Sequence, residues 1–232
     1  GVVLVQAANE LRHNDELFQA AATSSRPARV IGWVPLTEPA EVGAALRRYA
    51  DHPELVGVRH RIRDGEDPEF LLRPTVAASL EIIEAAGLTL DIMPWPPGVL
   101  EQVPTVAQQH PGLRIVIDML GWPEVAERRM QPWTDQLAAA AAEPHVHVKA
   151  GGLYRVSGEH PAPDSWRPYV ATAVELFGPE RIMLGTNWPT MTAFGRTYTE
   201  TIRALLASFD DLIEIEQGQV MAGTAARIYR FG

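Results

Sequence analysis

The chain has 232 residues, of which 46% are hydrophobic and 21% are charged, a composition typical of soluble globular proteins. A formal net charge of -9 without a basic run argues against nucleic acid as a partner, and no apolar run approaches the roughly 18 residues of a membrane span. The sequence contains no cysteine, which excludes disulfides and thiolate chemistry. Because no signal peptide is visible, we expect a cytoplasmic protein.

Short apolar runs predict seven β-strands, and helical patterns separate them. The strands are expected at residues 2–6, 29–34, 55–60, 88–92, 113–118, 146–149 and 181–185. Helices are expected at residues 14–22, with Asn14 as N-cap, and at 38–50, 75–86, 99–109, 133–142, 165–177, 197–208 and 219–229. This regular alternation predicts a single parallel α/β domain over residues 1–232, with right-handed crossovers.

The number of strands leaves two α/β architectures open. A closed (β/α)8 TIM barrel needs eight strands, and this sequence has seven and begins inside one. Either the first strand of a barrel is missing from this sequence, or the sheet is open and doubly wound. No glycine-rich nucleotide fingerprint follows any strand, so the barrel is the favoured interpretation.

The stretch at residues 181–189, Arg-Ile-Met-Leu-Gly-Thr-Asn-Trp-Pro, predicts a buried strand that ends in a loop. Gly185 allows a sharp exit from the strand, and Pro189 stops further ladder pairing. Side chains at the carboxyl ends of parallel strands line active sites, so Asn187 is a candidate site residue. The alternative is an Asx-type turn in which Asn187 bonds its own backbone.

Six blocks of sequence cover nearly the whole chain in the order of a known family. They are residues 3–6, 56–60, 115–123, 146–153, 177–189 and 221–229, and Phe-Gly-Pro-Glu-Arg-Ile-Met-Leu-Gly-Thr-Asn-Trp-Pro at 177–189 is the most specific. Together they resemble the amidohydrolase-related (amidohydrolase 2) family. The resemblance is strongest to its lactonase branch, which includes pyrone-dicarboxylate lactonase and fuconolactonase-like metal-dependent hydrolases.

The resemblance implies an amidohydrolase-type barrel that hydrolyses a small, acidic cyclic ester, a lactone. It also implies a His-x-His pair on the first strand, an Asp-His on a later strand and Ser-Asp-Trp-Pro after the last, which bind a metal or activate water. This sequence departs from each motif. The His-x-His strand is missing, Met119 stands in the place of the second-position histidine, and Asn187 stands in the place of the aspartate.

These departures change the chemistry that the residues can perform. A neutral amide cannot act as a general base, and a thioether does not replace imidazole as a ligand of zinc. We therefore expect a degenerate metal site, with no metal ligand among the residues present. A divalent metal such as zinc, and the general base, are expected only if a His-x-His strand precedes Gly1.

Three candidates for substrate binding end the third and fourth predicted strands. Arg59 and His60 are expected at the barrel mouth, but one of the two must point outward because side chains alternate along a strand. Asp91 could hydrogen-bond a substrate, and the alternative is that it caps a loop amide.

Two further candidates are charged residues on the next two strands. Asp118 is a catalytic candidate, and orienting an arginine is its structural alternative. Lys149, the chain's only lysine, could stabilise an anionic intermediate, and its alternative is an ion pair with Asp118 or Asp91. His145 and His147 have metal-like spacing, but they begin a strand and are expected to be structural.

The remaining candidates lie in loops. The resemblance puts an arginine near Arg155 in contact with the lactone or its carboxylate, beside Tyr154, and the alternative is a solvent-exposed pair. Trp188 and Trp33 could wall an apolar pocket, or pack in the core.

The leading hypothesis is a lactonase-type hydrolase in which water attacks an ester carbonyl at the barrel mouth. Its partner would be a small acidic molecule, and assembly into a homo-oligomer is left open. One alternative is a catalytically degenerate barrel that binds a small acid or a protein partner. Another is a lyase or decarboxylase of the same superfamily.

Overall fold

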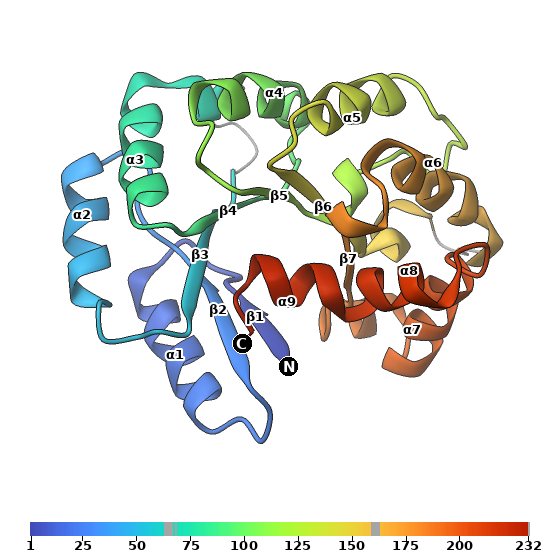
Figure 1. Cartoon of the computed structure of the whole chain (residues 1–232), viewed down its shortest axis with the longest axis horizontal. Helices are drawn as coiled ribbons and strands as arrows, with labels where there is room; N and C mark the ends of the chain where they lie inside the picture. The colour runs from blue at the N-terminus through green and yellow to red at the C-terminus, as the bar shows by residue number, and fades with distance from the viewer. Residues whose placement is uncertain (63–66, 68, 159–162, 232) are drawn as a thin grey trace. The chain divides into compact units, whose positions relative to one another are not determined.

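The computed structural model describes residues 1–62, 67, 69–158 and 163–231 (Figure 1). The chain forms two compact units, which we describe separately. The first unit comprises Gly1–Val116 and Ala226–Gly232, and the second comprises Ile117–Ala225. The expectation of a single domain stays a prediction.

The first unit contains a parallel sheet whose strands follow the order of the sequence. Its strands are β1 (Val2–Val5), β2 (Ala28–Gly32), β3 (Leu55–His60) and β4 (Thr89–Ile92), and β5 (Ile115–Ile117) lies at the boundary with the second unit. Its helices are α1 (Leu11–Ala22), α2 (Pro39–Arg48), α3 (Pro74–Ala85) and α4 (Val99–Gln109), with the short 3-10 helix η1 (Phe70–Leu72). The register places Arg59 beside Asp91, so both candidates stand at the carboxyl end of this sheet.

Apolar periodicity explains why these elements form. In α4, the buried residues Val99, Val103 and Val106 recur at helical spacing and are fully or almost fully enclosed. The strands are buried apolar runs, as expected for parallel strands between helices.

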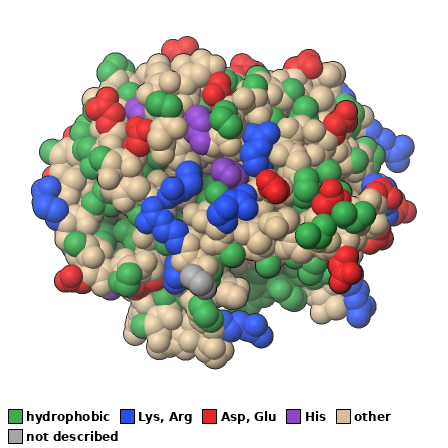
Figure 2. Space-filling view, viewed as in Figure 1, with side chains coloured by type: hydrophobic (Ala, Val, Ile, Leu, Met, Phe, Trp, Pro, Cys, Tyr) green, Lys and Arg blue, Asp and Glu red, His purple; other side chains and the backbone are tan. Residues whose placement is uncertain are grey.

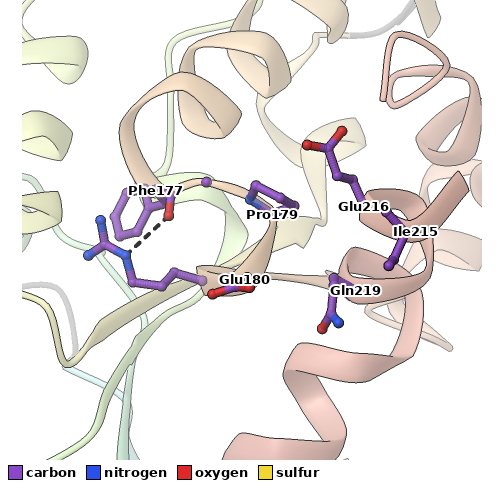
Figure 3. Close-up of a pocket in the computed structure, with 8 residues that line it drawn as sticks. Phe177, Pro179, Glu180, Ile215, Glu216 and Gln219 are labelled. Atoms are coloured by element: carbon purple, nitrogen blue, oxygen red, sulfur yellow. Dashed lines mark hydrogen bonds between the residues drawn. The ribbon is translucent and has the colours of Figure 1, made fainter. Parts of the chain in front are cut away.

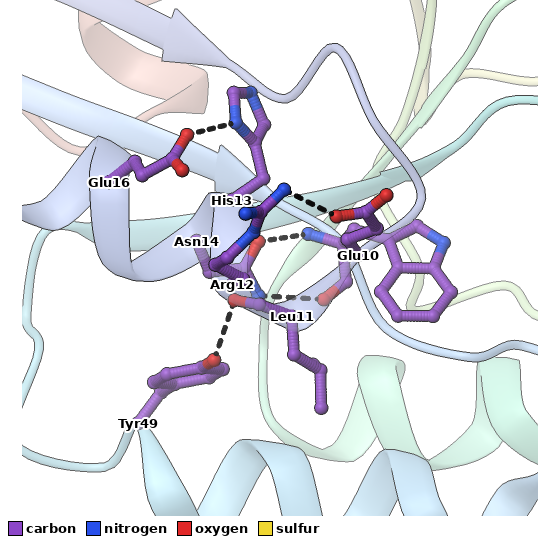
Figure 4. A network of polar contacts seen from close by, with 8 residues as sticks. Glu10, Leu11, Arg12, His13, Asn14, Glu16 and Tyr49 are labelled. Atoms are coloured by element: carbon purple, nitrogen blue, oxygen red, sulfur yellow. Dashed lines mark hydrogen bonds and ion pairs between the residues drawn. The ribbon is translucent and has the colours of Figure 1, made fainter.

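Asn14 was expected to cap the first helix, and this expectation is wrong. Helix α1 begins at Leu11, with Glu10 as N-cap, and Asn14 is buried within it. Its side chain donates to the Trp33 carbonyl and accepts from the Trp33 amide, both at 2.8 Å, while Tyr49 Oη donates to the Leu11 carbonyl (Figure 4). A buried asparagine can satisfy the backbone where β2 ends, and this tertiary role replaces the local capping role.

The second unit is built around two parallel strands, β6 (Val146–Gly151) and β7 (Ile182–Gly185). Its helices are α5 (Trp133–Ala141), α6 (Arg167–Phe177), α7 (Tyr198–Ala207) and α8 (Glu214–Gly218), followed by the π-helical turn η7 (Gln219–Gly223). The last helix, α9 (Thr224–Ile228), begins in the second unit and ends in the first. Short 3-10 turns complete it: η2 (Met119–Gly121), η3 (Leu153–Val156), η4 (Pro163–Ser165), η5 (Pro179–Arg181) and η6 (Thr190–Phe194). The final helix therefore starts earlier than predicted and is interrupted.

Glycines allow β6 and β7 to approach closely at their carboxyl ends. Gly151 is paired with Gly185, and a Cβ atom on Gly151 would collide with the Gly185 backbone. Both strands can therefore end side by side, and the residues that follow them are brought together.

The surface combines uncharged areas with scattered charged side chains (Figure 2). Among the described residues, no helix is both long and apolar enough to cross a bilayer. On the face drawn in Figure 2, several Lys and Arg side chains gather near the middle and others are scattered toward the edges, and most of the visible surface is uncharged.

Candidate functional site

A buried ion pair lies at the carboxyl end of β6, in the second unit. Lys149 Nζ is 2.9 Å from Asp118 Oδ1, and the two side chains are only 13% and 5% exposed. Asp118 directly follows β5, and Lys149 lies within β6. The contact is the ion pair with Asp118 that the sequence offered as the alternative for Lys149. The orientation of an arginine by Asp118 stays a prediction.

The corner after β7 is closed by its backbone and by Thr186, and not by the Asn187 side chain. Thr186 Oγ1 accepts from the Trp188 amide at 3.3 Å, and the Asn187 carbonyl accepts from the Thr190 amide at 2.9 Å. Asn187 has a left-handed backbone with φ 52°, a region in which asparagine is enriched. Its Nδ2 atom is buried, and no described residue accepts a hydrogen bond from it. The side-chain amide is therefore a buried donor without an acceptor.

Gly152 and Met119 define the surroundings of this amide. A Cβ atom on Gly152 would lie 2.7 Å from Met119 Cε and 3.2 Å from Asn187 Nδ2. Gly152 also has a positive φ of 70°, so glycine suits this position for two reasons. The contacts place the methionine thioether and the amide on the same small patch of backbone, directly after β6.

Tyr154 supports the same corner. Its side chain is almost fully buried, and its hydroxyl donates to the Asn187 carbonyl at 3.4 Å. Burial raises the pKa of Tyr154 to about 12, against the opposing effects of the Arg155 charge and of the Asn187 side chain. The phenol is therefore a neutral hydrogen-bond donor at neutral pH.

Arg155 is exposed and lies between two aromatic rings. Its Cζ is 5.4 Å from the centre of the Trp122 ring and 5.8 Å from that of Phe194, distances typical of cation–π contacts. The Phe194 ring is 5.2 Å from the Tyr154 ring. These contacts fix an accessible guanidinium beside the Tyr154 corner. Trp188 is 64% exposed, and its role as a pocket wall stays a prediction.

In the first unit, Arg59 and His60 are held by residues that follow β1 and β2. Arg59 Nη2 donates to the Gln6 carbonyl, and Gln6 Nε2 donates to the Arg59 carbonyl at 2.6 Å. His60 stacks on Phe70 at 4.7 Å and accepts through Nδ1 from Trp33 Nε1 at 3.0 Å. An indole N–H can only donate, so this contact requires an imidazole ring without a proton on Nδ1.

Asp91 is buried and hydrogen-bonded within the first unit. Thr89 Oγ1 donates to its Oδ1 at 3.2 Å, and Tyr229 Oη donates to its Oδ2 at 2.8 Å. These partners tie β4 to the last turn of the chain. Substrate binding by Asp91 stays a prediction.

The residues present do not fit a zinc-type site. Asp118 already faces the Lys149 ammonium, Met119 offers a thioether, and Asn187 presents an amide nitrogen, a set that lacks the imidazoles and carboxylates that zinc prefers. Within the described part of the chain, no three His, Asp or Glu side chains are grouped to hold a metal. His147 Nδ1 lies 3.1 Å from the His145 carbonyl, a local backbone contact.

A separate hollow of about 500 Å³ lies at the amino end of β7, in the second unit (Figure 3). Pro179 and Glu180 of η5 line one side, and Ile215 and Gln219 line the other. Arg181 also borders it, but its guanidinium donates to the carbonyls of Ala141, Glu143 and Phe177. This hollow therefore lies at the end of the strand that is remote from Asn187, and its arginine has a structural role.

Several contributors to these sites could not be found from the sequence. Trp122 lies in the family block at residues 115–123 but shows no signal of its own. Nothing in the sequence indicates that Phe194 is the second aromatic residue beside Arg155. Gln6 is fully buried, and no described donor reaches its Oε1. Its only sequence signal is a polar residue at the end of the first apolar run.

Comparisons with known proteins agree on one family. The sequence matches the family model for amidohydrolases over residues 1–231. An L-fucono-1,5-lactonase from Burkholderia ambifaria is 30% identical over 190 residues, which are 81% of this chain and 64% of that protein. An L-fucono-1,5-lactonase from Burkholderia multivorans is 27% identical over 235 residues, 92% of this chain and 75% of that protein. This chain thus spans less than two thirds of the first relative.

A solved structure shares the fold. A crystal structure of an amidohydrolase from Burkholderia multivorans with bound zinc has a TM-score of 0.89 and 26% identity, and the match covers 99% of this chain and 83% of that one. Seven strands are present in the described residues, in agreement with the sequence. The predicted fold class, an α/β barrel of the amidohydrolase type with one strand fewer than eight, is confirmed.

Proposed function

The chain belongs to the amidohydrolase family, and from that premise we propose that it hydrolyses a small, acidic lactone. The observation that carries the proposal is the buried Lys149–Asp118 pair near a corner where Asn187 Nδ2 lacks an acceptor. The Lys149 ammonium and the Asn187 amide can both donate hydrogen bonds to an oxygen that becomes negatively charged during the reaction. The relatives named as lactonases support the choice of reaction.

In the proposed reaction, water adds to the ester carbonyl and an oxyanion develops. Its collapse breaks the ring C–O bond, and the proton that water loses ends on the released alkoxide oxygen. The Lys149 ammonium polarises the carbonyl, and Asp118 holds that ammonium in place through the 2.9 Å contact. Asn187 Nδ2 donates a second hydrogen bond to the oxyanion, and Tyr154 steadies the Asn187 backbone. Donors fixed in advance in this way stabilise the transition state more than the ground state.

Arg155 is proposed to select acidic substrates. Its guanidinium is exposed and held between Trp122 and Phe194, and a planar fork suits a carboxylate. In the first unit, Arg59 and His60 are proposed as further contacts for an acidic group. No step is assigned to a metal, because the residues present do not fit one.

The test is turnover of a panel of acidic and neutral lactones by purified protein, compared with a Lys149→Met variant. We expect hydrolysis of an acidic lactone by the unmodified chain and its loss in the variant. Because Lys149→Met removes the ammonium that faces Asp118, the double variant Lys149→Met with Asp118→Asn serves as the folded control. No hydrolysis of any lactone by folded protein would refute the proposal.

The rival function is binding of a small acid without turnover, and Met119 and Asn187 motivate it. Calorimetry with the same lactones and their ring-opened acids separates the two, since binding without hydrolysis favours the rival. A variant that combines Met119→His with Asn187→Asp is then titrated with zinc. Zinc uptake with new activity would identify a decayed metal site.

A further inference from the structure

Two arginines of the first unit donate to one backbone carbonyl, and a third donates to the backbone of one of the two. Arg114 Nη2 donates to the Gly87 carbonyl at 2.6 Å, and Arg230 Nη2 donates to the same oxygen. Arg29 donates to the Arg230 carbonyl through Nε at 3.1 Å and Nη2 at 2.7 Å. We call Arg29, Arg114 and Arg230 the arginine cluster. Its members lie 85 or more positions apart in the sequence.

Among the described residues, no carboxylate forms an ion pair with the arginine cluster. In the described part of the chain, the ion pairs involve none of these three side chains. Burial lowers the pKa of Arg114, and the positive charge of Arg230 lowers it further. Arg114 Nε is buried, and no described residue accepts its hydrogen bond. Two like charges therefore share one carbonyl while a buried donor lacks an acceptor, an arrangement that an anion would complete.

The backbone at Arg230 disfavours an arginine. Arg230 has φ 54°, in the left-handed region that favours glycine, and the Phe231 amide closes the turn by donating to the Ala226 carbonyl at 2.9 Å. Gly87, which follows α3, has a similar left-handed backbone with φ 67°, and there the residue is the glycine that this conformation favours. The arginine at position 230 is thus held against its local preference. The Arg29 guanidinium, in turn, lies 4.9 Å from the centre of the Phe231 ring.

The arginine cluster is distinct from the candidate site of the same unit. Arg29 is near the amino end of β2, and Arg114 immediately precedes β5, whereas His60 and Asp91 stand at the carboxyl ends of β3 and β4. The stretch after α9, which carries Arg230, lies beside β1 and β2 (Figure 1). A ligand at the cluster would therefore approach the opposite end of this sheet.

We propose that the arginine cluster is a binding site for a small oxyanion of the phosphate class. Guanidinium groups bind phosphate oxygens through paired N–H donors, and the two guanidiniums that share the Gly87 carbonyl suit a doubly charged anion better than a single carboxylate. The Gly87 carbonyl keeps the Arg114 and Arg230 side chains close together in the absence of the anion.

The test is calorimetric titration with inorganic phosphate at low ionic strength, with sodium chloride of equal ionic strength as reference. We expect saturable binding of phosphate, a matching rise of Tm, and neither effect with chloride. Glycerol phosphate is titrated in parallel. Similar affinity would show that the site accepts phosphate esters, and weaker affinity that it accepts the free ion. Failure of both to bind would overturn the proposal.

A matched pair of variants isolates the cluster. Arg230→Gly should weaken phosphate binding roughly tenfold to a hundredfold, while the folded chain becomes no less stable because glycine suits the backbone. Arg128 has the same left-handed backbone, with φ 53°, but is not part of the cluster, so Arg128→Gly should leave phosphate binding unchanged. Equal binding by Arg230→Gly and the unmodified chain would overturn the proposal. Equal loss in both variants would do so as well.

Discussion

Lys149 and the arginine cluster are two positively charged regions that differ in their partners. Lys149 is buried against Asp118, so the protein supplies its counter-charge. In the described structure, the arginine cluster donates hydrogen bonds only to carbonyl oxygens, and Arg29 also lies over the Phe231 ring. A charge that is balanced internally can be kept in a fixed position for chemistry. A charge that is left unbalanced favours the capture of an anion from solution.

The largest expected effect comes from breaking the balanced pair. Asp118→Asn leaves the Lys149 ammonium buried without its counter-charge, which should lower the free energy of unfolding by about 3 kcal/mol or more. Denaturant unfolding measures the loss. Adding Lys149→Met should restore most of the stability, because the pair is then replaced by neutral groups. If Asp118→Asn were as stable as the unmodified chain, the claim that Asp118 balances the Lys149 charge would be contradicted.

The next effect concerns the neutral donor beside the balanced pair. Asn187→Ala should slow lactone hydrolysis by about a hundredfold to a thousandfold, since one oxyanion donor is removed. Stability should fall by only about 1 kcal/mol, because alanine is disfavoured at the left-handed φ of 52° while the backbone and Thr186 still close the corner. Steady-state kinetics and thermal unfolding, measured on the same preparation, separate the two effects. A slower rate that is fully explained by partial unfolding would remove Asn187 from the mechanism.

Tyr154 gives a smaller effect that depends on pH. A tyrosine in the unfolded chain ionises near pH 10, whereas burial raises the pKa of Tyr154 to about 12 in the fold. Below pH 10 the phenol is neutral in both states and its contribution is complete. Between about pH 10 and 12 only the unfolded chain ionises, so roughly 2 to 3 kcal/mol of stability is lost as the pH rises. Unfolding curves of Tyr154→Phe should lack this part of the decline, and parallel curves would disprove it.

The smallest effect should come from the arginine cluster itself. Arg114→Met removes one of two like charges, so in phosphate-free buffer the free energy of unfolding should change by about 1 kcal/mol or less. In phosphate the unmodified chain should gain stability and the variant should not. Denaturation in both buffers provides the measurement. A large loss of unfolding free energy in phosphate-free buffer would show that the cluster stabilises the fold, and would contradict its proposed role as an anion site.

Local patterns predicted the fold well because they depend on neighbouring residues. The strand at residues 55–60 and the helix at 99–109 have the bounds that their apolar periodicity indicated. Asn14 was misassigned because its partner, the Trp33 backbone, is 19 positions away. Predictions failed where a tertiary contact competed with a local preference.

The candidate site could be predicted only in part, for the same reason. Strand ends and the family blocks indicated Asn187, Lys149 and Asp118 as site residues. For Lys149 the sequence offered two roles, a catalytic one and an ion pair, and the structure shows the ion pair with Asp118. The aromatic neighbours of Arg155 and the arginine cluster join residues with no common motif. Arg29 and Arg230 are 201 positions apart, so the negative net charge of the sequence concealed a local excess of positive charge.

The Lys149–Asp118 contact also turns the chain's only lysine into a natural reporter. An amine-directed acylating reagent has a single side-chain target in these 232 residues, apart from the terminal amine. That target is shielded and held as an ammonium, which is not nucleophilic. The rate of acylation at Lys149, followed by mass spectrometry, therefore measures how often the pair opens, without any label being introduced.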